Sequence, residues 1–547
     1  MVLAEDLGRS MKTTLSSALL LGVLPLLGPP PADVEWPARR PRQERDEDGR
    51  FGRGLRAPLI PLGMHLPRRL TATDAVAAAL FTLSCAGGAS PAAGRVESPS
   101  PSPSPSPSRD RSALVAAVDA LAAEARERGP IAGLSIAVFE HGKAVLAKGY
   151  GSADLESGVP ATAETSYPIA SVTKHFTAAM VLRLADQGTL SLDDPLSRFF
   201  PAARPRIGAL TIRHLLDHTS GLTRGGPAPR AAALSVLTRG GTGRAQGQDW
   251  DYSNYNFSLL GLVIELASGR DYARYVHDEL AVPLGLTGTA YCEDGSAVPG
   301  RGRDYLSGVK SVTPTSYWTE PRFFAAGGLC STVLDLVRWE KALEEGRVVS
   351  PAMLQAMRAP ARLADGLEVD YGYGTRLGFT GGHRKLGHTG GGQSNKAVLA
   401  RYPDDDVTVA VLMNTERANA RVTATDLEES IERLFFGLSE PSVRSASAAA
   451  RDLHTYAGQY RDGSRLVRLA TDGGALTMRP GARHRADSRL LPEGGEVFAA
   501  AEEPSIELRF QVRDGRVHGY GRYHNGWFVG LAERQALAAD LLHAELP

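Results

Sequence analysis

The chain has 547 residues, more than one ordinary domain needs, and 43% of them are hydrophobic, enough for a large core. Its formal net charge of +0 gives no overall attraction to nucleic acid or to an anionic membrane, so we expect no nucleic-acid partner. After residue 110, no apolar run is long enough to cross a bilayer.

Two stretches within residues 1–110 resemble export signals. Lys12 precedes an apolar run over residues 18–27, which is typical of a signal peptide. A second candidate begins at Met64 and leads through another apolar run to Cys85, as in a lipoprotein signal. Both stretches predict export of the protein.

An uninterrupted alternation of serine and proline over residues 98–108 follows these signals and predicts an extended spacer without a core. We therefore interpret residues 1–110 as a targeting segment and disordered linker. The protein is expected to be periplasmic, or a lipoprotein attached to the membrane of the bacterial envelope through a lipidated Cys85. A disordered tail without a targeting role is the alternative.

The next region opens with a predicted helix over residues 112–128. Strands are predicted over 134–139 and 144–150, with a turn at His141-Gly142 between them. The pattern indicates a helix followed by a hairpin.

The stretch Ser171-Val172-Thr173-Lys174 places a hydroxyl and an amine three residues apart, where an apolar helix ending near Gly188 begins. Residues three apart share one face of a helix. A serine hydroxyl is a poor nucleophile near neutral pH, and a neighbouring amine can take its proton. The stretch therefore predicts a nucleophile and its base; a helix cap followed by a surface lysine is the simpler alternative.

Two further motifs follow along the chain. Tyr252-Ser253-Asn254 precedes an apolar helix over residues 257–264 that ends at Gly269. Later, Gly387-His388-Thr389-Gly390-Gly391 is predicted as a glycine-rich turn leading toward an apolar strand over 397–400.

In this order, the three blocks resemble those of the serine β-lactamase and penicillin-binding protein superfamily. The closest resemblance is to its class C β-lactamase-like branch of esterases and D-aminopeptidases, over about residues 115–437. The matching residues are Ser171 and Lys174 for Ser-x-x-Lys, Tyr252 and Asn254 for Tyr-x-Asn, and His388, Thr389 and Gly390 for the third motif. The resemblance implies an α+β (α/β-type sandwich) fold over residues 111–440, an antiparallel sheet flanked by helices with a mostly helical subdomain.

The resemblance also implies catalytic roles. Ser171 would attack an acyl carbon and form an ester intermediate that water later hydrolyses. Lys174 could act as base only when neutral, so burial and nearby positive charge must lower its pKa. Tyr252 could share the proton, and we treat Lys174 and Tyr252 as one coupled pair.

Substrate contacts are implied at the remaining motif positions. The backbone amides of Ser171 and Gly391 are expected to form an oxyanion hole, and Thr389 and Gly390 to line the site. Asn254 is expected to hold the substrate amide and to orient Lys174.

His388 departs from the pattern of the β-lactamases, which usually carry lysine there to bind a β-lactam carboxylate. A histidine is mostly neutral at pH 7 and offers a weaker contact for an anion. His388 is therefore expected to favour an ester or a small D-residue amide over a β-lactam. A polar residue at the end of a strand is the alternative.

Other histidines receive simpler interpretations. His218 follows Asp217 and invites comparison with a Ser-His-Asp triad, but the run predicts a helix end and a polar turn. His141, His175 and His383 lack the spacing of metal ligands, so no metal and no cofactor is predicted.

If Cys85 is lipidated, Cys292 and Cys330 remain. Exported chains can pair such thiols, and the sequence leaves open whether these two meet. A free, buried Cys330 acting as a small hydrophobic residue is the alternative.

The last region, residues 451–535, is rich in short alternating strands. Apolar residues alternate from Ile506 to Val512, and a turn is predicted at Asp514-Gly515 before a return strand. The region resembles the small lipocalin-like antiparallel β-barrel appended to many of these hydrolases. It could shape the mouth of the site or be purely structural.

Together these features predict a serine hydrolase that forms an acyl-enzyme with a small-molecule ester or a small D-amino acid or peptide amide. One alternative is a β-lactamase or a penicillin-binding D-Ala-D-Ala carboxypeptidase. Another is a catalytically silent homologue that binds peptidoglycan or another partner, although retention of Ser171, Lys174 and Tyr252 argues for activity. The oligomeric state is left open.

Overall fold

The structure is a computed structural model that describes most of the chain after residue 110. The described residues are 111–222, 226–241, 243–292, 298–308, 311–316, 322–392, 394–416, 422–439, 452–462, 465–472, 475–480 and 487–535. The predicted export signals, the Ser/Pro spacer and Cys85 lie outside them. No helix in the described ranges combines the length and apolarity needed to cross a membrane.

The predicted helix and hairpin at the start of the described region are confirmed. Helix α1 spans Arg111–Arg128, and strands β1 and β2 span Gly133–Glu140 and Lys143–Asp154. His141 and Gly142 both have positive φ angles, 48° and 70°. Two such residues form the tight turn whose twist suits a two-residue hairpin.

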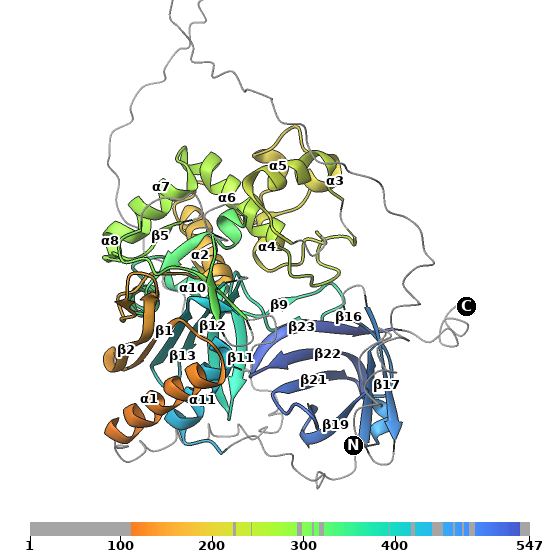
Figure 1. The fold of residues 1–547 in the computed structure, drawn as a ribbon. Helices are drawn as coiled ribbons and strands as arrows, with labels where there is room; N and C mark the ends of the chain where they lie inside the picture. The colour runs from red at the N-terminus through yellow and green to blue at the C-terminus, as the bar shows by residue number, and fades with distance from the viewer. Residues whose placement is uncertain are drawn as a thin grey trace, which may run out of the picture. The chain divides into compact units, whose positions relative to one another are not determined.

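Strand β1 lies inside an antiparallel sheet whose other strands come mostly from much later in the chain (Figure 1). The order is β11 (Arg376–Thr380), β12 (His383–Gly391), β13 (Lys396–Tyr402), β14 (Val407–Met413), β1, β2 and β3 (Val159–Pro160). Leu134, Ile136 and Val138 of β1 pack with residues of α1 and of α11 (Ala424–Phe436). Ala137, on the opposite face, joins the larger core formed with the central helices.

A largely helical part lies in the sequence between β4 and the sheet strands β11–β14. Its helices are η1 (Ala170–Val172), α2 (Thr173–Asp186), η2 (Leu196–Arg198), α3 (Pro205–Gly208), α4 (Ile212–Leu216), α5 (Arg230–Arg239), α6 (Asn254–Ser268), α7 (Tyr272–Val276), η3 (His277–Ala281), α8 (Val282–Leu284), η5 (Phe324–Ala326), α9 (Val333–Glu344) and α10 (Pro351–Met357). Short strands accompany them: β4 (Tyr167–Pro168), β5 (Ala290–Tyr291), β6 (Tyr305–Ser307), β7 (Val312–Pro314), β8 (Leu329–Ser331), β9 (Ala361–Arg362), β10 (Glu368–Val369) and β15 (Thr415–Glu416). The mixture of helices and sheets predicted for this region is confirmed. We call residues 111–439 the main region.

The C-terminal strands form a closed antiparallel barrel, as predicted. They are β16 (Gly458–Asp462), β17 (Arg465–Asp472), β18 (Ala475–Pro480), β19 (Ser488–Gly494), β20 (Val497–Ala500), β21 (Ile506–Arg513), β22 (Arg516–His524) and β23 (Trp527–Arg534), preceded by the short helix η6 (Leu453–Thr455). Each strand pairs with the next, and β16 pairs with β23 to close the ring. We call these eight strands the barrel; its likeness to lipocalins stays a prediction.

The barrel is joined to the main region through the backbone of one strand pair. Gly378 of β11 lies opposite Trp527 of β23, so the sheet of the main region and the barrel form one run of 15 strands. A side chain at Gly378 would place its Cβ 2.2 Å from the carbonyl oxygen of Gly526. Glycine is therefore needed where the two backbones approach.

Cys292 and Cys330 form a disulfide. Both residues are fully buried, and Cys330 lies in β8 opposite Ala290 of β5. The pairing left open by the sequence is thus settled, and the interpretation of Cys330 as a free thiol is wrong.

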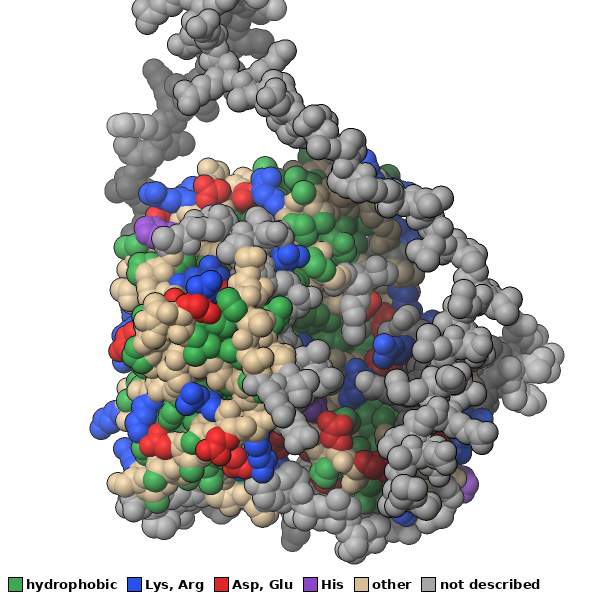
Figure 2. All heavy atoms as spheres, viewed as in Figure 1, with side chains coloured by type: hydrophobic (Ala, Val, Ile, Leu, Met, Phe, Trp, Pro, Cys, Tyr) green, Lys and Arg blue, Asp and Glu red, His purple; other side chains and the backbone are tan. Residues whose placement is uncertain are grey.

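The face drawn in Figure 2 carries basic and acidic side chains in mixture. Lysine and arginine side chains lie among aspartate and glutamate side chains there, without a continuous patch of one sign. Such a face produces no strong field of a single sign.

Candidate active site

Ser171 and Lys174 lie at the junction of η1 and α2. Ser171 occupies the 3-10 turn, and Lys174 lies in the first turn of the α-helix that follows it directly. Their side chains meet, with 3.1 Å between Lys174 Nζ and Ser171 Oγ. Ala170 has a φ of 45°, a costly left-handed conformation for alanine, where the chain turns from β4 into this helix.

Lys174 has no solvent-exposed surface, and three acceptors surround its amine. Besides Ser171 Oγ, Nζ donates to Asn254 Oδ1 at 2.8 Å and to the carbonyl oxygen of Ala326 at 2.7 Å. An ammonium group has three N–H donors, so each has a partner. In a neutral amine, two N–H groups can stay on Asn254 and Ala326 while the lone pair faces Ser171.

The segment that supplies the Ala326 carbonyl is fastened to α2. Thr177 Oγ1 donates to the carbonyl oxygen of Ala325 at 2.7 Å, and the Leu329 N–H donates to Thr173 Oγ1 at 3.1 Å. Gly261 of α6 permits this segment to lie close, because a Cβ there would stand 2.4 Å from the Cβ of Ala325. The acceptor for Lys174 is thus held by packing on two helices.

The Tyr252-Ser253-Asn254 motif leads into α6, as predicted, and His218 holds its backbone. His218 Nδ1 accepts hydrogen bonds from the Ser253 N–H at 3.2 Å and from the Asn256 amide at 3.0 Å. Its ring centroid is 4.4 Å from that of Tyr252. The helix end and turn predicted at His218 are confirmed, and its contacts give it a positioning role beside Tyr252.

Asn254 is the first residue of α6, and its side-chain amide makes hydrogen bonds to two partners. Its Oδ1 accepts from Lys174, and its Nδ2 donates to the carbonyl oxygen of Gly226 at 3.1 Å. The structure thus places Asn254 where it orients Lys174. Holding a substrate amide stays a prediction for this residue.

Two positive charges face Tyr252, whose buried hydroxyl has no hydrogen bond of ordinary geometry within the described ranges of the chain. Lys174 Nζ is 4.9 Å, and the guanidinium carbon of Arg376 is 5.2 Å, from the centre of the ring. Burial by itself raises the pKa of Tyr252, but these two charges, together with the polar side chains of Ser171 and Lys174, hold the pKa below its ordinary value. The site therefore favours a phenolate more than water does.

The pKa of Lys174 is shifted in the direction that a base requires. Burial lowers the pKa of Lys174 below that of an ordinary lysine, and Arg376 lowers it further, while Tyr252 acts in the opposite direction. Because the two groups interact so closely, their protons belong to the Lys174–Tyr252 pair rather than to either residue alone.

His388 lies within β12, fully buried, and is not at the end of a strand. Its Nδ1 lies 2.6 Å from the carbonyl oxygen of Thr389, and its Nε2 lies 3.1 Å from the hydroxyl of Tyr371. Burial, Arg376 and Lys174 lower its pKa well below the ordinary value, so the ring is neutral. The neutral tautomer with the proton on Nδ1 satisfies both contacts.

The third motif is a strand rather than the predicted turn. Residues 387–391 form the end of β12 and pair with β13 throughout, which leaves no room for a turn. Gly390 lies against the segment that carries Ser171, since a Cβ there would stand 2.2 Å from the carbonyl oxygen of Ile169. Gly391 is exposed beyond it, and the oxyanion role of the Ser171 and Gly391 amides stays a prediction.

Arg376 and Tyr371 are site residues that the sequence motifs did not identify. Both precede β12 along the chain, near the alternation of glycine and aromatic residues over 371–374. That pattern indicates close packing: Gly374 has a φ of 62°, and a Cβ there would stand 2.6 Å from the carbonyl oxygen of Lys174. Nothing in it shows that the Arg376 side chain faces Tyr252.

Comparisons with known proteins identify the family of the chain. The family model described as Beta-lactamase matches residues 118–432. The chain is 27% identical over 410 residues to the D-aminopeptidase of Brucella anthropi, covering 71% of this chain and 73% of the relative. It is 25% identical over 430 residues to Penicillin-binding protein 4* of Bacillus subtilis strain 168, covering 72% of this chain and 93% of the relative.

A solved structure supports the same fold. The D-amino acid amidase of Ochrobactrum anthropi SV3, complexed with D-phenylalanine, superposes with a TM-score of 0.53 at 23% identity. The match covers 60% of this chain and 99% of that one. On its sequence match, its ordered motifs and its fold, the chain belongs to the beta-lactamase family.

Proposed function

We propose that the protein is a serine hydrolase that forms an acyl-enzyme at Ser171. The observation that carries this proposal is the buried amine of Lys174, held by Asn254 and Ala326 with its remaining direction toward the Ser171 hydroxyl. A partner-binding protein would gain nothing from burying an amine in this way, because burial of a charge costs free energy. A nucleophile and its base need this geometry.

In the first step, Ser171 Oγ attacks the acyl carbon of the substrate. A bond forms between Oγ and that carbon, the bond to the leaving group breaks, and the Oγ proton passes to the Lys174–Tyr252 pair. The pair then gives the proton to the departing alcohol or amine. Ser171 is left as an ester of the acyl group.

In the second step, water attacks this ester. The Lys174–Tyr252 pair accepts a proton from the water as its oxygen bonds to the acyl carbon, and Ser171 leaves and regains its proton. The free acid is released and the resting site is restored. No cofactor is needed for either step.

The expected substrate is an ester or a small amide of a D-amino acid or peptide. The neutral, buried His388 offers no fixed cation for a carboxylate at the position where β-lactamases use lysine. The name D-aminopeptidase of a relative that matches 71% of this chain supports the amide alternative.

Covalent labelling tests the proposed nucleophile. Wild-type protein treated with a fluorophosphonate probe should gain one adduct in its intact mass, and Ser171→Ala should gain none. Ser135→Ala, which removes a buried hydroxyl in β1, serves as the matched control and should still label. Absence of labelling in the folded wild type would favour the catalytically silent, partner-binding alternative.

Substrate preference is tested separately by the turnover of a nitrophenyl ester, a D-alanyl amide and a chromogenic cephalosporin. We expect kcat/KM for the ester or the D-alanyl amide to exceed that for the cephalosporin. A large preference for the cephalosporin would contradict the inference from His388 and would support the β-lactamase or penicillin-binding alternative. The similarity to Penicillin-binding protein 4* is the observation that favours this alternative.

We also propose that the protein is exported and is held at the envelope through Cys85. The buried disulfide between Cys292 and Cys330 supports export, because structural disulfides form and persist mainly in oxidising compartments. Palmitate labelling in cells that is lost in Cys85→Ala would support the anchor, and a fully cytosolic protein would contradict export.

A further inference from the structure

Residues 525–528 comprise the two-residue turn between β22 and β23 and the first two residues of β23, and they contact the main region. Asn525 and Gly526 form the tight turn, with φ angles of 50° and 70°. The Phe379 N–H donates to the carbonyl oxygen of Gly526 at 3.1 Å, and Trp527 lies opposite Gly378. We call these four residues the barrel turn.

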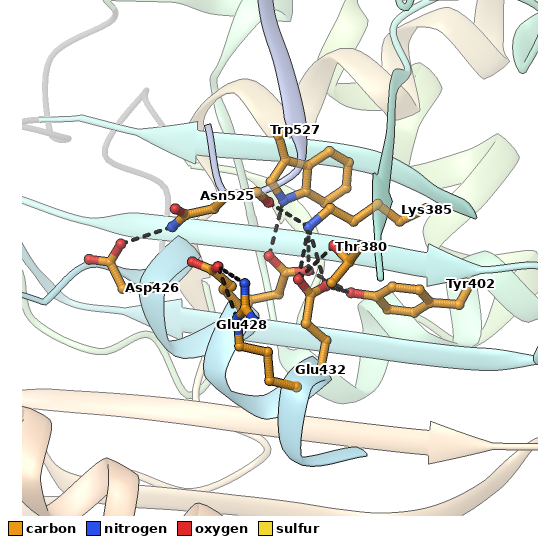
Figure 3. A network of polar contacts seen from close by, with 10 residues as sticks. Thr380, Lys385, Tyr402, Asp426, Glu428, Glu432, Asn525 and Trp527 are labelled. Atoms are coloured by element: carbon orange, nitrogen blue, oxygen red, sulfur yellow. Dashed lines mark hydrogen bonds and ion pairs between the residues drawn. The ribbon is translucent and has the colours of Figure 1, made fainter. Parts of the chain in front are cut away.

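One side of the barrel turn is anchored in a buried network of charged groups (Figure 3). Lys385 Nζ donates to the carbonyl oxygen of Asn525 at 2.7 Å and lies 4.7 Å from the centre of the Trp527 ring. Trp527 Nε1 donates to Glu428 at 3.0 Å, and the Asn525 amide donates to Asp426 at 2.9 Å. These bonds come from α11 and β12, so the turn is held by the main region.

The other side of the barrel turn touches the neighbours of Tyr252. The carbonyl oxygen of Phe528 accepts a hydrogen bond from Arg376, and the Phe528 ring lies 5.0 Å from that of Trp250. Trp250 stands two residues before Tyr252 in the chain. In the described part of the chain no carboxylate pairs with Arg376, so its charge is not neutralised where it faces the Tyr252 ring at 5.2 Å.

We propose that Arg376 is a positioning residue of the site, held by the barrel turn, and that its charge sets the pH at which Ser171 can lose its proton. This inference rests on the proposed serine-hydrolase function. A cation near Tyr252 and Lys174 disfavours protonation of both groups. The barrel then contributes to the chemistry of the site through the Phe528 carbonyl, which holds Arg376.

Other titratable groups also surround Tyr252 and belong to the same balance. Those around its ring come from α2, the turn after α4, the segment before β11, and β12: Lys174, His218, Tyr371 and His388. Asp217 acts on the neighbouring Tyr371. Burial keeps His388 neutral and raises the pKa of Tyr371 well above its ordinary value. Lys174, from this set, and Arg376 are therefore the cations that act directly on the Tyr252 hydroxyl.

The test is the rate of fluorophosphonate labelling of the full chain as a function of pH. In Arg376→Gln, the acidic limb of the pH–rate profile for labelling should move to higher pH by about one unit or more, since a cation at this distance shifts a pKa by that amount. Arg376→Lys, which retains the charge, should restore most of the wild-type limb. An unchanged limb in folded Arg376→Gln would overturn the proposal.

Two further variants separate charge from attachment. Gly378→Ala would push the Gly526 carbonyl away from β11, and we expect a smaller shift in the same direction. Gly378→Ala also provides the test if Arg376→Gln does not fold. A wild-type pH dependence of labelling in Gly378→Ala would refute the role of the barrel. Arg244→Gln breaks a different contact with the barrel, the 2.9 Å ion pair with Glu533, and should keep the wild-type limb.

An equal shift in Arg244→Gln would also contradict the proposal, because loosening of the barrel alone would then explain the effect. Failure of the folded wild type to label at any pH would refute the serine-hydrolase function itself. The two failures are therefore distinguishable.

Discussion

Lys174 combines complete burial with three acceptors from three different segments. Only Ser171 can also give up a proton, so the arrangement singles out one hydroxyl for deprotonation. The desolvation that lets the amine lose its proton at a lower pH also makes each of its hydrogen bonds stronger. At the scale of single residues, burial thus favours the neutral amine, while hydrogen bonds to its acceptors favour the ammonium and fix its orientation toward Ser171.

Replacement of Tyr252 by phenylalanine tests whether the phenol shares the proton. The ring stays and only the hydroxyl is lost, so Lys174 must accept the Ser171 proton alone. We expect kcat for ester hydrolysis to fall by about 10² to 10⁴-fold, the usual range for positioned acid–base catalysis. A fall below tenfold would show that Lys174 suffices. Tyr460→Phe, which removes a hydroxyl inside the barrel, should keep wild-type turnover.

At the scale of elements, the site forms where the start of a helix packs against the C-terminal end of strand β12. The turn η1 that carries Ser171 packs on β12, and the carbonyl oxygen of Ile169 lies where any side chain at Gly390 would stand. The approach of strand and helix, rather than any contact with substrate, explains why glycine is needed there. Gly387 meets a similar constraint against the Leu399 carbonyl of β13.

Gly390→Ala should therefore separate β12 from the segment that carries Ser171. A Cβ placed 2.2 Å from the Ile169 carbonyl forces a backbone shift, and we expect a loss of about 1–3 kcal/mol in the free energy of unfolding. Activity should fall more than stability, since the shift occurs at the site. Denaturant unfolding and ester turnover measure the two effects. Gly129→Ala, with its nearest neighbour at 3.6 Å, is the control and should change neither.

The predicted elements show which signals in a sequence are local. The hairpin at His141-Gly142 and the helix end at Gly269 were predicted correctly, because turn and cap residues act on their immediate neighbours. The stretch 387–391 was predicted wrongly as a turn, because its glycines serve close packing against other segments. Glycines of the two kinds look alike in a sequence.

At the scale of the whole molecule, the described residues belong to one compact unit in which the barrel continues the sheet of the main region. Lys385, Glu428 and Glu432 lie at this junction with fully buried side chains. Burial and the neighbouring charge of Glu428 raise the pKa of Glu432 to about 8. Glu432 therefore holds a proton in the folded protein at neutral pH, which balances one cation against one anion (Figure 3).

This raised pKa makes stability depend on pH with a definite sign. Folded Glu432 binds its proton more tightly than the unfolded chain does, so its contribution is complete below about pH 4 and is lost as pH rises toward 8. In Glu432→Gln no proton can be lost, and the decline in unfolding free energy over that range should be shallower by on the order of 1 kcal/mol or more. Denaturant unfolding at a series of pH values measures the decline.

Glu429→Gln provides the control for that series. Glu429 lies on the same helix, is partly exposed and pairs with Arg433 at 2.8 Å. It should keep the wild-type dependence on pH. An identical slope for Glu432→Gln and the wild type would contradict the assignment of this proton to Glu432.

The sequence by itself determined the family and the order of the three motifs, and it predicts Ser171, Lys174, Tyr252 and Asn254 as site residues, because chemistry and local helix geometry tie these to short spacings. Only the tertiary structure decided that Arg376 faces Tyr252, that Ala326 holds Lys174, and that the barrel turn supports both the sheet and the site. These contacts join residues separated by about 120 to 150 positions in the chain. Such pairs are made by packing, and no local pattern records them.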